Sequence, residues 1–312
     1  MSGRILVTPR SLSNGGHPAM QPLIDAGFEL VFPAPGATPS EADLIAAIPN
    51  CVGWLCGVEK VSADVIDAAD ALRVISRNGT GVDNLPMTAL AARGIAIARA
   101  EGANARGVAE LALTLALSGL RDVVATHEGM KTGAWPRRIG REMAGAQVGV
   151  VGLGAIGASF ASFCLALGAQ VRGYDPFAPE DRITAANFVR VDLAASLENA
   201  DVVSLHAPMP TDGTPLVGAA LLDRLAFGAV LVNTARAGLV DEVALLAALD
   251  SGQISTYATD VFDTEPPQPS ALLAHPRVIL TSHIGGFTNE SVARATSVAV
   301  ANLLNGLGVH AH

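Results

Sequence analysis

A stretch of 29 residues without a charged side chain, 143–171, constrains the fold of this chain more than any other feature. It is long enough to cross a bilayer as a single helix. Glycines interrupt it, however, and glycine weakens a helix interior. We therefore expect a buried strand, a tight turn and a packed helix in place of a membrane span. The glycines of this stretch are Gly145, Gly149, Gly152, Gly154, Gly157 and Gly168.

A glycine pattern inside this stretch indicates a dinucleotide site. Residues 148–151 are typical of a strand, and a G-x-G-x-x-G sequence follows at once and opens a helix expected to run to about residue 168. Gly152 permits the sharp turn, Gly154 lets backbone N–H groups approach a pyrophosphate, and Gly157 lets the helix pack against the strand. The helix N-terminus also favours phosphate. The residues expected at the cofactor are Gly152, Gly154, Ala155, Ile156 and Gly157.

The next apolar run, 170–174, ends at Asp175, which lies 18 residues beyond Gly157. An acidic residue at that strand end can accept hydrogen bonds from both ribose hydroxyls and repels a 2′-phosphate. Arg172 would favour NADP only if it faced the ribose, and strand alternation places it on the other side. NAD is therefore the favoured cofactor.

Short apolar runs alternate with helical patterns along the chain, which is typical of parallel α/β construction. The length is about twice that of a usual domain. We predict an α/β fold with two Rossmann-like parallel-sheet domains, the cofactor domain being inserted into the other. Expected strands are 5–8, 29–32, 52–56, 74–76, 95–98, 147–151, 170–174, 202–206, 230–233, 256–261 and 278–281; expected helices are 62–69 with Ser62 as N-cap, 108–131 crossing between the domains, and 288–304 returning to the first.

The charge balance argues against two classes of partner. Twenty basic and 29 acidic residues give a net charge of −9, which leaves no broad positive surface for nucleic acid or for an anionic membrane. The first ten residues lack the apolar core of a signal peptide. Cys51, Cys56 and Cys164 lack metal-ligand spacing, so we expect core residues, no metal site and a cytoplasmic location.

Four separated motifs carry a resemblance to a known family. They are RNGTGVDN at 77–84, NTARAGLVDE at 233–242, DVFDTEP at 260–266 and SHIGG at 282–286. In this order they resemble the D-isomer-specific 2-hydroxyacid dehydrogenases, in the phosphoglycerate dehydrogenase branch and in its short form without a regulatory domain. The resemblance implies a substrate-binding (catalytic) domain at 1–99 and 288–312, and an NAD-binding Rossmann domain at 100–287.

The chemistry of three residues agrees with the activity that the resemblance implies. Reducing a 2-oxo acid requires a fixed cation for the carboxylate and the carbonyl oxygen, and a proton donor that works near neutral pH. Arg236 can make a two-point contact with the substrate, and His283 can act as acid and base. Glu265 would hold the second nitrogen of the imidazole and favour its protonated form. Each of the three residues could also have a purely structural role. Their occurrence together after the glycine motif favours the catalytic interpretation.

Further site residues follow from the resemblance alone. Asp260 matches an acid near the nicotinamide amide, and Thr80 matches a loop residue at the cofactor. Asn78 and Gly79 match the loop whose N–H groups bind the substrate carboxylate, beside Arg236 and His283. His206 matches a strand-end motif with a structural role. The remaining residues that the resemblance places at the cofactor are Ala207, Thr234, Ala235, Gly285 and Gly286.

One departure from the family pattern concerns the substrate. Phosphoglycerate dehydrogenases usually have an arginine where this chain has Cys56, which weakens the case for a phosphorylated substrate. Arg106, Arg137 and Arg138 could compensate, or they could be solvated surface residues. The expected substrate is thus a small 2-hydroxy or 2-oxo acid, with phosphoglycerate, glyoxylate and hydroxypyruvate all open.

Two other functions remain open, and one assembly is expected. An NAD-sensing, corepressor-like binding protein would keep the same three catalytic-type residues. A dehydrogenase of formate or phosphite is the third possibility, and formate is disfavoured because Glu265 stands where that branch tends to have glutamine. The family resemblance also implies a homodimer, with the 108–131 helix and the loop around Trp135 at the interface.

Overall fold

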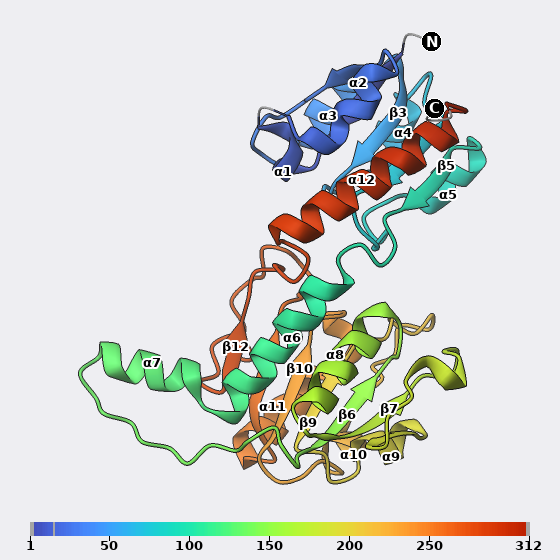
Figure 1. Ribbon diagram of the computed structural model, residues 1–312. Helices are drawn as coiled ribbons and strands as arrows, with labels where there is room; N and C mark the ends of the chain where they lie inside the picture. Colours follow the sequence, from blue (N-terminus) through green and yellow to red (C-terminus); the bar gives the residue numbers. More distant parts are fainter. Residues whose placement is uncertain (1–2, 15, 310–312) are drawn as a thin grey trace. The chain divides into compact units, whose positions relative to one another are not determined.

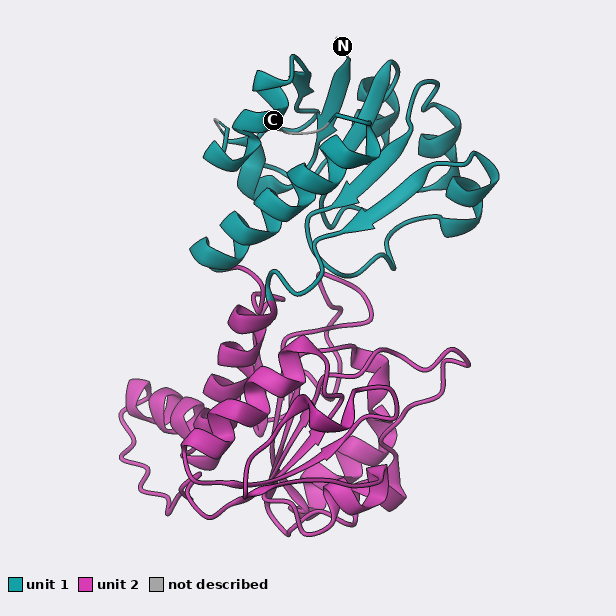
Figure 2. Ribbon diagram, turned by 45° about the vertical axis from the view of Figure 1, so that its right-hand side comes forward, with its two compact units in different colours: residues 1–104, 288–312 teal, residues 105–287 magenta. Residues whose placement is uncertain are grey.

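The computed structural model describes residues 3–14 and 16–309, and the chain divides into two compact units (Figure 2). Unit 1 comprises Met1–Asn104 and Thr288–His312, and unit 2 comprises Ala105–Phe287, so unit 2 is inserted into the sequence of unit 1. Of the outer domain expected from the sequence, residues 1–2, 15 and 310–312 lie outside the described part. Each unit is built on one parallel sheet, which confirms the predicted fold class.

Unit 1 has a five-stranded sheet in the order β2-β1-β3-β4-β5. Alternate residues of its strands enter opposite layers: Ile5 packs with α12 on one face, and Leu6 packs with α3 and α4 on the other (Figure 1). Its strands are β1 (Arg4–Val7), β2 (Glu29–Val31), β3 (Cys51–Cys56), β4 (Val74–Arg77) and β5 (Ala96–Arg99), and its α-helices are α1 (Arg10–Ser13), α2 (Gln21–Asp25), α3 (Glu41–Ala47), α4 (Ala63–Asp67), α5 (Met87–Ala92) and α12 (Asn289–Gly306).

Unit 2 has a seven-stranded sheet in the order β12-β11-β10-β9-β6-β7-β8. Helices α6 and α8 pack side by side on one face, while α9, α10 and α11 cover the other (Figure 1). Its strands are β6 (Gln147–Val151), β7 (Gln170–Tyr174), β8 (Phe188–Arg190), β9 (Val202–Leu205), β10 (Ala229–Asn233), β11 (Ile254–Thr259) and β12 (Val278–Leu280), and its α-helices are α6 (Ala105–Leu120), α7 (Val123–Lys131), α8 (Ala155–Ala166), α9 (Leu193–Leu197), α10 (Ala219–Leu222) and α11 (Glu242–Ser251).

The long helix expected at 108–131 is two helices, and that expectation was wrong. Asp122 adopts a left-handed conformation with φ 54° between α6 and α7. The chain returns to the end of α6, where the Arg141 N–H donates to the Leu120 carbonyl at 2.9 Å, and Arg138 pairs with the Asp122 carboxylate at 3.0 Å. Tertiary bonds thus take over a carbonyl that a continuing helix would have used.

A helix cap, a short strand and the three cysteines bear on further expectations from the sequence. Ser62 caps α4 by accepting the Val65 N–H, as predicted. Strand β8 was missed because three residues with an exposed centre give no apolar run. Cys51, Cys56 and Cys164 are free and buried, as expected of core residues, while the cytoplasmic location stays a prediction. Within the described residues, no helix has both the length and the apolar composition that crossing a membrane requires.

Candidate active site

The glycine motif forms a tight turn between β6 and α8. Gly152 has φ 93°, and a Cβ atom there would lie 2.7 Å from the Ala207 nitrogen. A Cβ on Gly157 would lie 1.8 Å from the Gly152 carbonyl oxygen, so the helix can pack here only through glycine. Gly154 differs, because a Cβ there would enter open space. The turn thus leaves room beside Gly154, at the N-terminus of α8, where a pyrophosphate can approach.

Asp175 follows β7 and faces this turn. Its Oδ2 accepts the Leu153 N–H at 2.8 Å, and its Oδ1 accepts those of Phe177 and Ala178 at 2.8 and 3.0 Å. Partial burial raises the pKa of this carboxyl, but the three backbone N–H groups and the nearby Arg190 outweigh it and lower the pKa below its ordinary value. Asp175 is therefore ionised at neutral pH, in keeping with repulsion of a 2′-phosphate.

Arg172 does not face the ribose position. Its guanidinium donates to the Glu198 carbonyl at 2.8 Å and lies 3.5 Å from that of Ala195, at the end of α9. The orientation inferred from strand alternation is confirmed, and Arg172 gives no support to NADP.

Two side chains, one buried and one half-buried, lie where β9 and β10 end, next to the glycine turn. His206 places Nε2 2.9 Å from the Ser204 hydroxyl and tilts against Phe160, and burial lowers the pKa of its imidazole to about 3. The hydroxyl of Thr234 is buried without a hydrogen-bond partner in the part of the chain that the structure describes. Buried hydroxyls rarely stay unpaired, so an orphan at a strand end beside a dinucleotide turn fits a cofactor contact there.

Glu265 and His283 form a close pair after β11 and β12. Nδ1 of His283 lies 2.7 and 2.9 Å from the two carboxylate oxygens of Glu265. An ionised carboxylate only accepts hydrogen bonds, so Nδ1 carries the proton and Nε2 is left for another partner. Both side chains are about half exposed, and the backbone of His283 is left-handed with φ 55°. The pairing predicted between these residues is present.

Asp260 anchors the loop that carries His283. Its Oδ1 accepts the Thr281 hydroxyl at 2.6 Å and the Ile284 N–H at 2.8 Å, and its Oδ2 accepts the Gly285 N–H at 2.8 Å. Only 2% of Asp260 is exposed. The carboxylate that the family resemblance assigns to the nicotinamide amide is thus engaged by the backbone on the C-terminal side of His283. Sequence reasoning missed this anchoring, because its donors are mostly backbone groups.

Arg236 follows β10, the strand next to β11. Asn233 fixes the turn before it: its Nδ2 donates to the Arg236 carbonyl at 2.8 Å, and its Oδ1 accepts the Ala235 N–H at 3.1 Å. Asn233 Nδ2 also lies 3.3 Å from the buried Tyr257 hydroxyl. Because parallel strands end at one edge, Arg236, Glu265 and His283 all follow the carboxyl ends of adjacent strands of one sheet.

The other predicted substrate residues belong to unit 1 and follow β4. The Asn78 N–H donates to the Cys56 carbonyl at 2.9 Å, and the Gly79 carbonyl accepts the Ala100 N–H at 3.1 Å. Thr80 is exposed. Arg77 is buried and donates to the Gly81 carbonyl at 2.9 Å, which closes the loop.

Comparison with known families identifies the cofactor-binding domain. The family model described as D-isomer specific 2-hydroxyacid dehydrogenase, NAD binding domain, matches residues 113–285, and NAD is thereby confirmed as the predicted cofactor. A D-3-phosphoglycerate dehydrogenase of Archaeoglobus fulgidus is 36% identical over 277 residues, which are 86% of this chain and 53% of that protein. The Bacillus subtilis enzyme of the same name is 32% identical over 98% of this chain and 58% of its own length. The chain therefore spans between half and three fifths of the length of these relatives.

Solved structures of similar fold match nearly the full length of the chain. A protein of Thermus thermophilus matches with a TM-score of 0.86 and 32% identity, covering 98% of this chain and 97% of its own. The NAD⁺-bound 3-phosphoglycerate dehydrogenase of Entamoeba histolytica matches with a TM-score of 0.82 and 26% identity, over 99% and 96%.

Proposed function

Because the chain belongs to the D-isomer-specific 2-hydroxyacid dehydrogenase family, we propose that it is an NAD-dependent oxidoreductase acting at C2 of a small 2-hydroxy or 2-oxo acid. The observation that carries this proposal is the His283–Glu265 pair. Glu265 fixes the tautomer in which Nε2 can exchange a proton with a substrate oxygen. That is the geometry an acid–base residue of such a reaction requires.

Each member of the trio has one role in the proposed reaction. Arg236 binds the carboxylate and carbonyl oxygen of the 2-oxo acid, because a guanidinium presents parallel N–H donors. His283 gives its Nε2 proton to the carbonyl oxygen as the C2–H bond forms, and takes it back in the reverse direction. Glu265 orients the imidazole and stabilises its positive charge, and Asp260 holds the loop beneath it.

The cofactor-binding residues are assigned to the carboxyl edge of unit 2, except for Thr80 of unit 1. NADH, when bound, supplies the hydride that reduces C2. The glycine turn receives the pyrophosphate, Asp175 the adenosine ribose, and Thr234 offers its unpaired hydroxyl. We extend the assignment to Thr80, Ala207, Ala235, Asp260, Gly285 and Gly286, as the family resemblance implies.

The two units take different roles in this proposal. Unit 2 binds the cofactor and carries Arg236, Glu265 and His283. Unit 1 contributes the substrate loop, in which the Gly79 N–H binds the substrate carboxylate. Glycine suits this position because no side chain blocks access to the backbone. The Asn78 N–H, which the family resemblance also assigns to the substrate, is instead engaged by the Cys56 carbonyl.

A spectrophotometric screen of NADH oxidation tests the function. The panel is glyoxylate, pyruvate, hydroxypyruvate, 3-phosphohydroxypyruvate, 3-sulfopyruvate and 2-oxoglutarate. We expect turnover with at least one acid, loss of turnover with retained NADH binding in His283→Ala, and mainly a lower kcat/KM in Arg236→Lys. Near-wild-type rates in both variants would contradict the proposed roles. NADH binding without turnover on any acid would favour an NAD-sensing binding protein.

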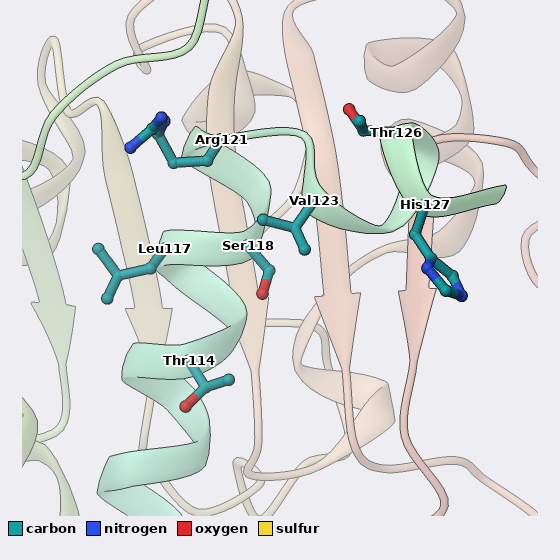
Figure 3. Close-up of a pocket in the computed structure, with 7 residues that line it drawn as sticks. All are labelled: Thr114, Leu117, Ser118, Arg121, Val123, Thr126 and His127. Atoms are coloured by element: carbon teal, nitrogen blue, oxygen red, sulfur yellow. The ribbon is translucent and has the colours of Figure 1, made fainter. Parts of the chain in front are cut away.

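We further propose that the chain forms a homodimer through α6, α7 and the loop that follows. Every residue of α7 is described and none is buried, although the helix contains Val123, Val124 and Met130. Trp135 and Ile139 in the next loop are also exposed. Figure 3 shows the hollow between α6 and α7, lined by Leu117 and Val123 among others.

Exposed apolar side chains gathered on one projecting element are typical of a protein interface. Sedimentation equilibrium should therefore give twice the chain mass, and Val123→Asp should shift the protein toward monomer. A wild-type chain that stays monomeric at micromolar concentration would contradict the dimer.

A further inference from the structure

A buried carboxylate lies at the ligand-binding edge of unit 1, where the function proposed above does not use it. The sheet order places β1 between β2 and β3, so the chain reverses its winding direction between β1 and β3. Ligands of open α/β sheets bind outside the carboxyl ends of the strands at such a point. Thr8 follows β1 and Gly57 follows β3, and Glu59 lies between them with only 3% of its surface exposed.

Protein donors hold this carboxylate in place. Oε1 of Glu59 accepts the Thr8 hydroxyl, the Gly57 N–H at 3.0 Å and the Cys56 thiol at 3.3 Å. The Trp54 indole N–H donates to the Thr8 hydroxyl at 2.9 Å, which fixes the orientation of that hydroxyl. The negative charge is therefore built into the sheet edge and cannot swing out to solvent.

The same edge carries the proposed substrate loop. The Asn78 N–H donates to the carbonyl of Cys56, the last residue of β3, at 2.9 Å. A 2-oxo acid whose carboxylate is bound at Gly79 would thus lie beside the loop that begins at Gly57. Val58 in that loop is 73% exposed and offers an apolar wall.

The buried arginine near this edge is held by protein carbonyls. Arg77 directs its guanidinium at the carbonyls of Gly81, Cys56 and Asn78. Its Nε and Nη1 donors are thus engaged within the protein.

Two of the three arginines that the sequence offers as compensation are engaged in unit 2. Arg106 pairs with Glu110 and stacks over Phe163, and Arg138 pairs with Asp122 at 3.0 Å. Exposed basic side chains near the edge in sequence are Arg10 and Lys60.

We propose that Glu59 is a specificity-determining residue that makes this protein select 2-oxo acids with a small uncharged side chain over those with a phosphate, sulfonate or second carboxylate. The inference rests on the proposed function and names its substrate class. A phosphate at C3 would bring up to two negative charges toward a buried carboxylate, where solvent screens the repulsion poorly. A hydroxymethyl group or hydrogen atom meets no such penalty.

Hydroxypyruvate and 3-phosphohydroxypyruvate differ only in the phosphate and form the natural test pair. For the wild type we expect a kcat/KM with hydroxypyruvate at least about tenfold above that with the phosphorylated acid. Glu59→Gln keeps the acceptor oxygen for Thr8 and Gly57 but removes the charge. It should shift the ratio by about tenfold toward the phosphorylated acid, as the loss of one partly screened charge implies.

One control variant, and one variant that tests a rival explanation, make the test specific. Glu29→Gln removes an exposed carboxylate at the start of β2, the opposite edge of the same sheet, and should leave the ratio unchanged. If Glu59 merely held the loop, both substrates would lose activity together in Glu59→Gln and the ratio would stay constant. The rival explanation is that Lys60 binds the phosphate. If the wild type prefers the phosphorylated acid and Lys60→Ala loses that preference, the inference is overturned.

A measurement on the wild type alone covers the case in which Glu59→Gln fails to fold. Glycerate should inhibit hydroxypyruvate reduction more strongly than 3-phosphoglycerate does, and the reverse order would overturn the inference. Turnover of both oxo acids without discrimination would overturn this inference alone. No turnover of any oxo acid would overturn the proposed function, and this inference with it.

Discussion

His283 adopts a left-handed backbone conformation that costs a residue with a Cβ on the order of 1 kcal/mol or more. The hydrogen bonds that Asp260 accepts on either side of it can offset that cost, since bonds to charged groups stabilise by about 1.5–3 kcal/mol each. The strained residue is therefore held from both flanks, with its ring aligned on Glu265.

Glu265→Gln tests what the carboxylate contributes at the residue scale. The amide can still meet Nδ1 but cannot stabilise a positive imidazole, and it permits the wrong tautomer. We expect kcat to fall by about 100-fold, within the range that acid–base catalysis contributes. The NADH dissociation constant, measured by fluorescence titration, should stay within a factor of about two, because the change lowers transition-state stabilisation only. A wild-type kcat would contradict the role of Glu265.

Asp175 is the residue that we propose to set the choice between the two nicotinamide cofactors. In Asp175→Ala the ionised carboxylate is absent, so the 2′-phosphate of NADPH is no longer repelled and the ribose hydroxyls of NADH lose an acceptor. The ratio of the NADPH and NADH dissociation constants should move by about tenfold or more toward NADPH, as expected for one charge interaction. Unchanged selectivity would remove Asp175 from the cofactor assignment.

His206 gives stability a pH dependence with a definite sign. Its pKa is 6.5 when unfolded and desolvation lowers it to about 3 in the folded chain, so the unfolded state binds more protons between these values. The free energy of unfolding must therefore fall as pH drops from about 6.5 toward 3, by up to roughly 5 kcal/mol from this residue. The free energy of unfolding, measured with urea at several pH values in this range, should fall less steeply with decreasing pH in His206→Gln than in the wild type. An equal pH dependence in the two proteins would contradict the role given to His206.

At the scale of elements, apolar runs located most strands, because buried parallel strands are continuously apolar. Glu29–Val31, Gln170–Tyr174 and Val278–Leu280 all fall within one residue of their expected bounds. The break at Asp122 could not be predicted, since it depends on the return of residues 138–141 to the end of α6. Strand β8 depends likewise on pairing with β7 and not on its own composition.

Two glycines of one turn should respond differently to the same methyl group. A Cβ at Gly157 would lie 1.8 Å from the Gly152 oxygen, so Gly157→Ala should lower the melting temperature by several degrees, about what 1–3 kcal/mol of overpacking causes. Gly154→Ala meets open space and should keep the wild-type melting temperature while weakening NAD binding. Thermal unfolding measures the melting temperature of each variant, and isothermal titration calorimetry measures its affinity for NAD. Equal melting temperatures for the two variants would contradict this account of the turn.

At the scale of the whole molecule, the sequence predicted those residues of the candidate site whose chemical type and position after a strand mark them as reactive. Arg236, Glu265 and His283 were located by three of the four ordered motifs, and the Glu265–His283 bond is present. Contacts made between distant backbone and side-chain groups were not predictable. The anchoring by Asp260 and the enclosure of Glu59 by Thr8 and Gly57 both depend on three-dimensional neighbours that no local pattern marks.

Hydride transfer from the cofactor to the substrate can be followed with NADH that carries deuterium at both C4 positions. We expect the 2-hydroxy acid formed from hydroxypyruvate or glyoxylate to carry one deuterium at C2, observed by NMR, and chiral products to have the D configuration. His283→Ala should form no labelled product while still binding NADH. A product labelled from solvent in place of NADH, or oxidation of NADH without label at C2, would contradict the account.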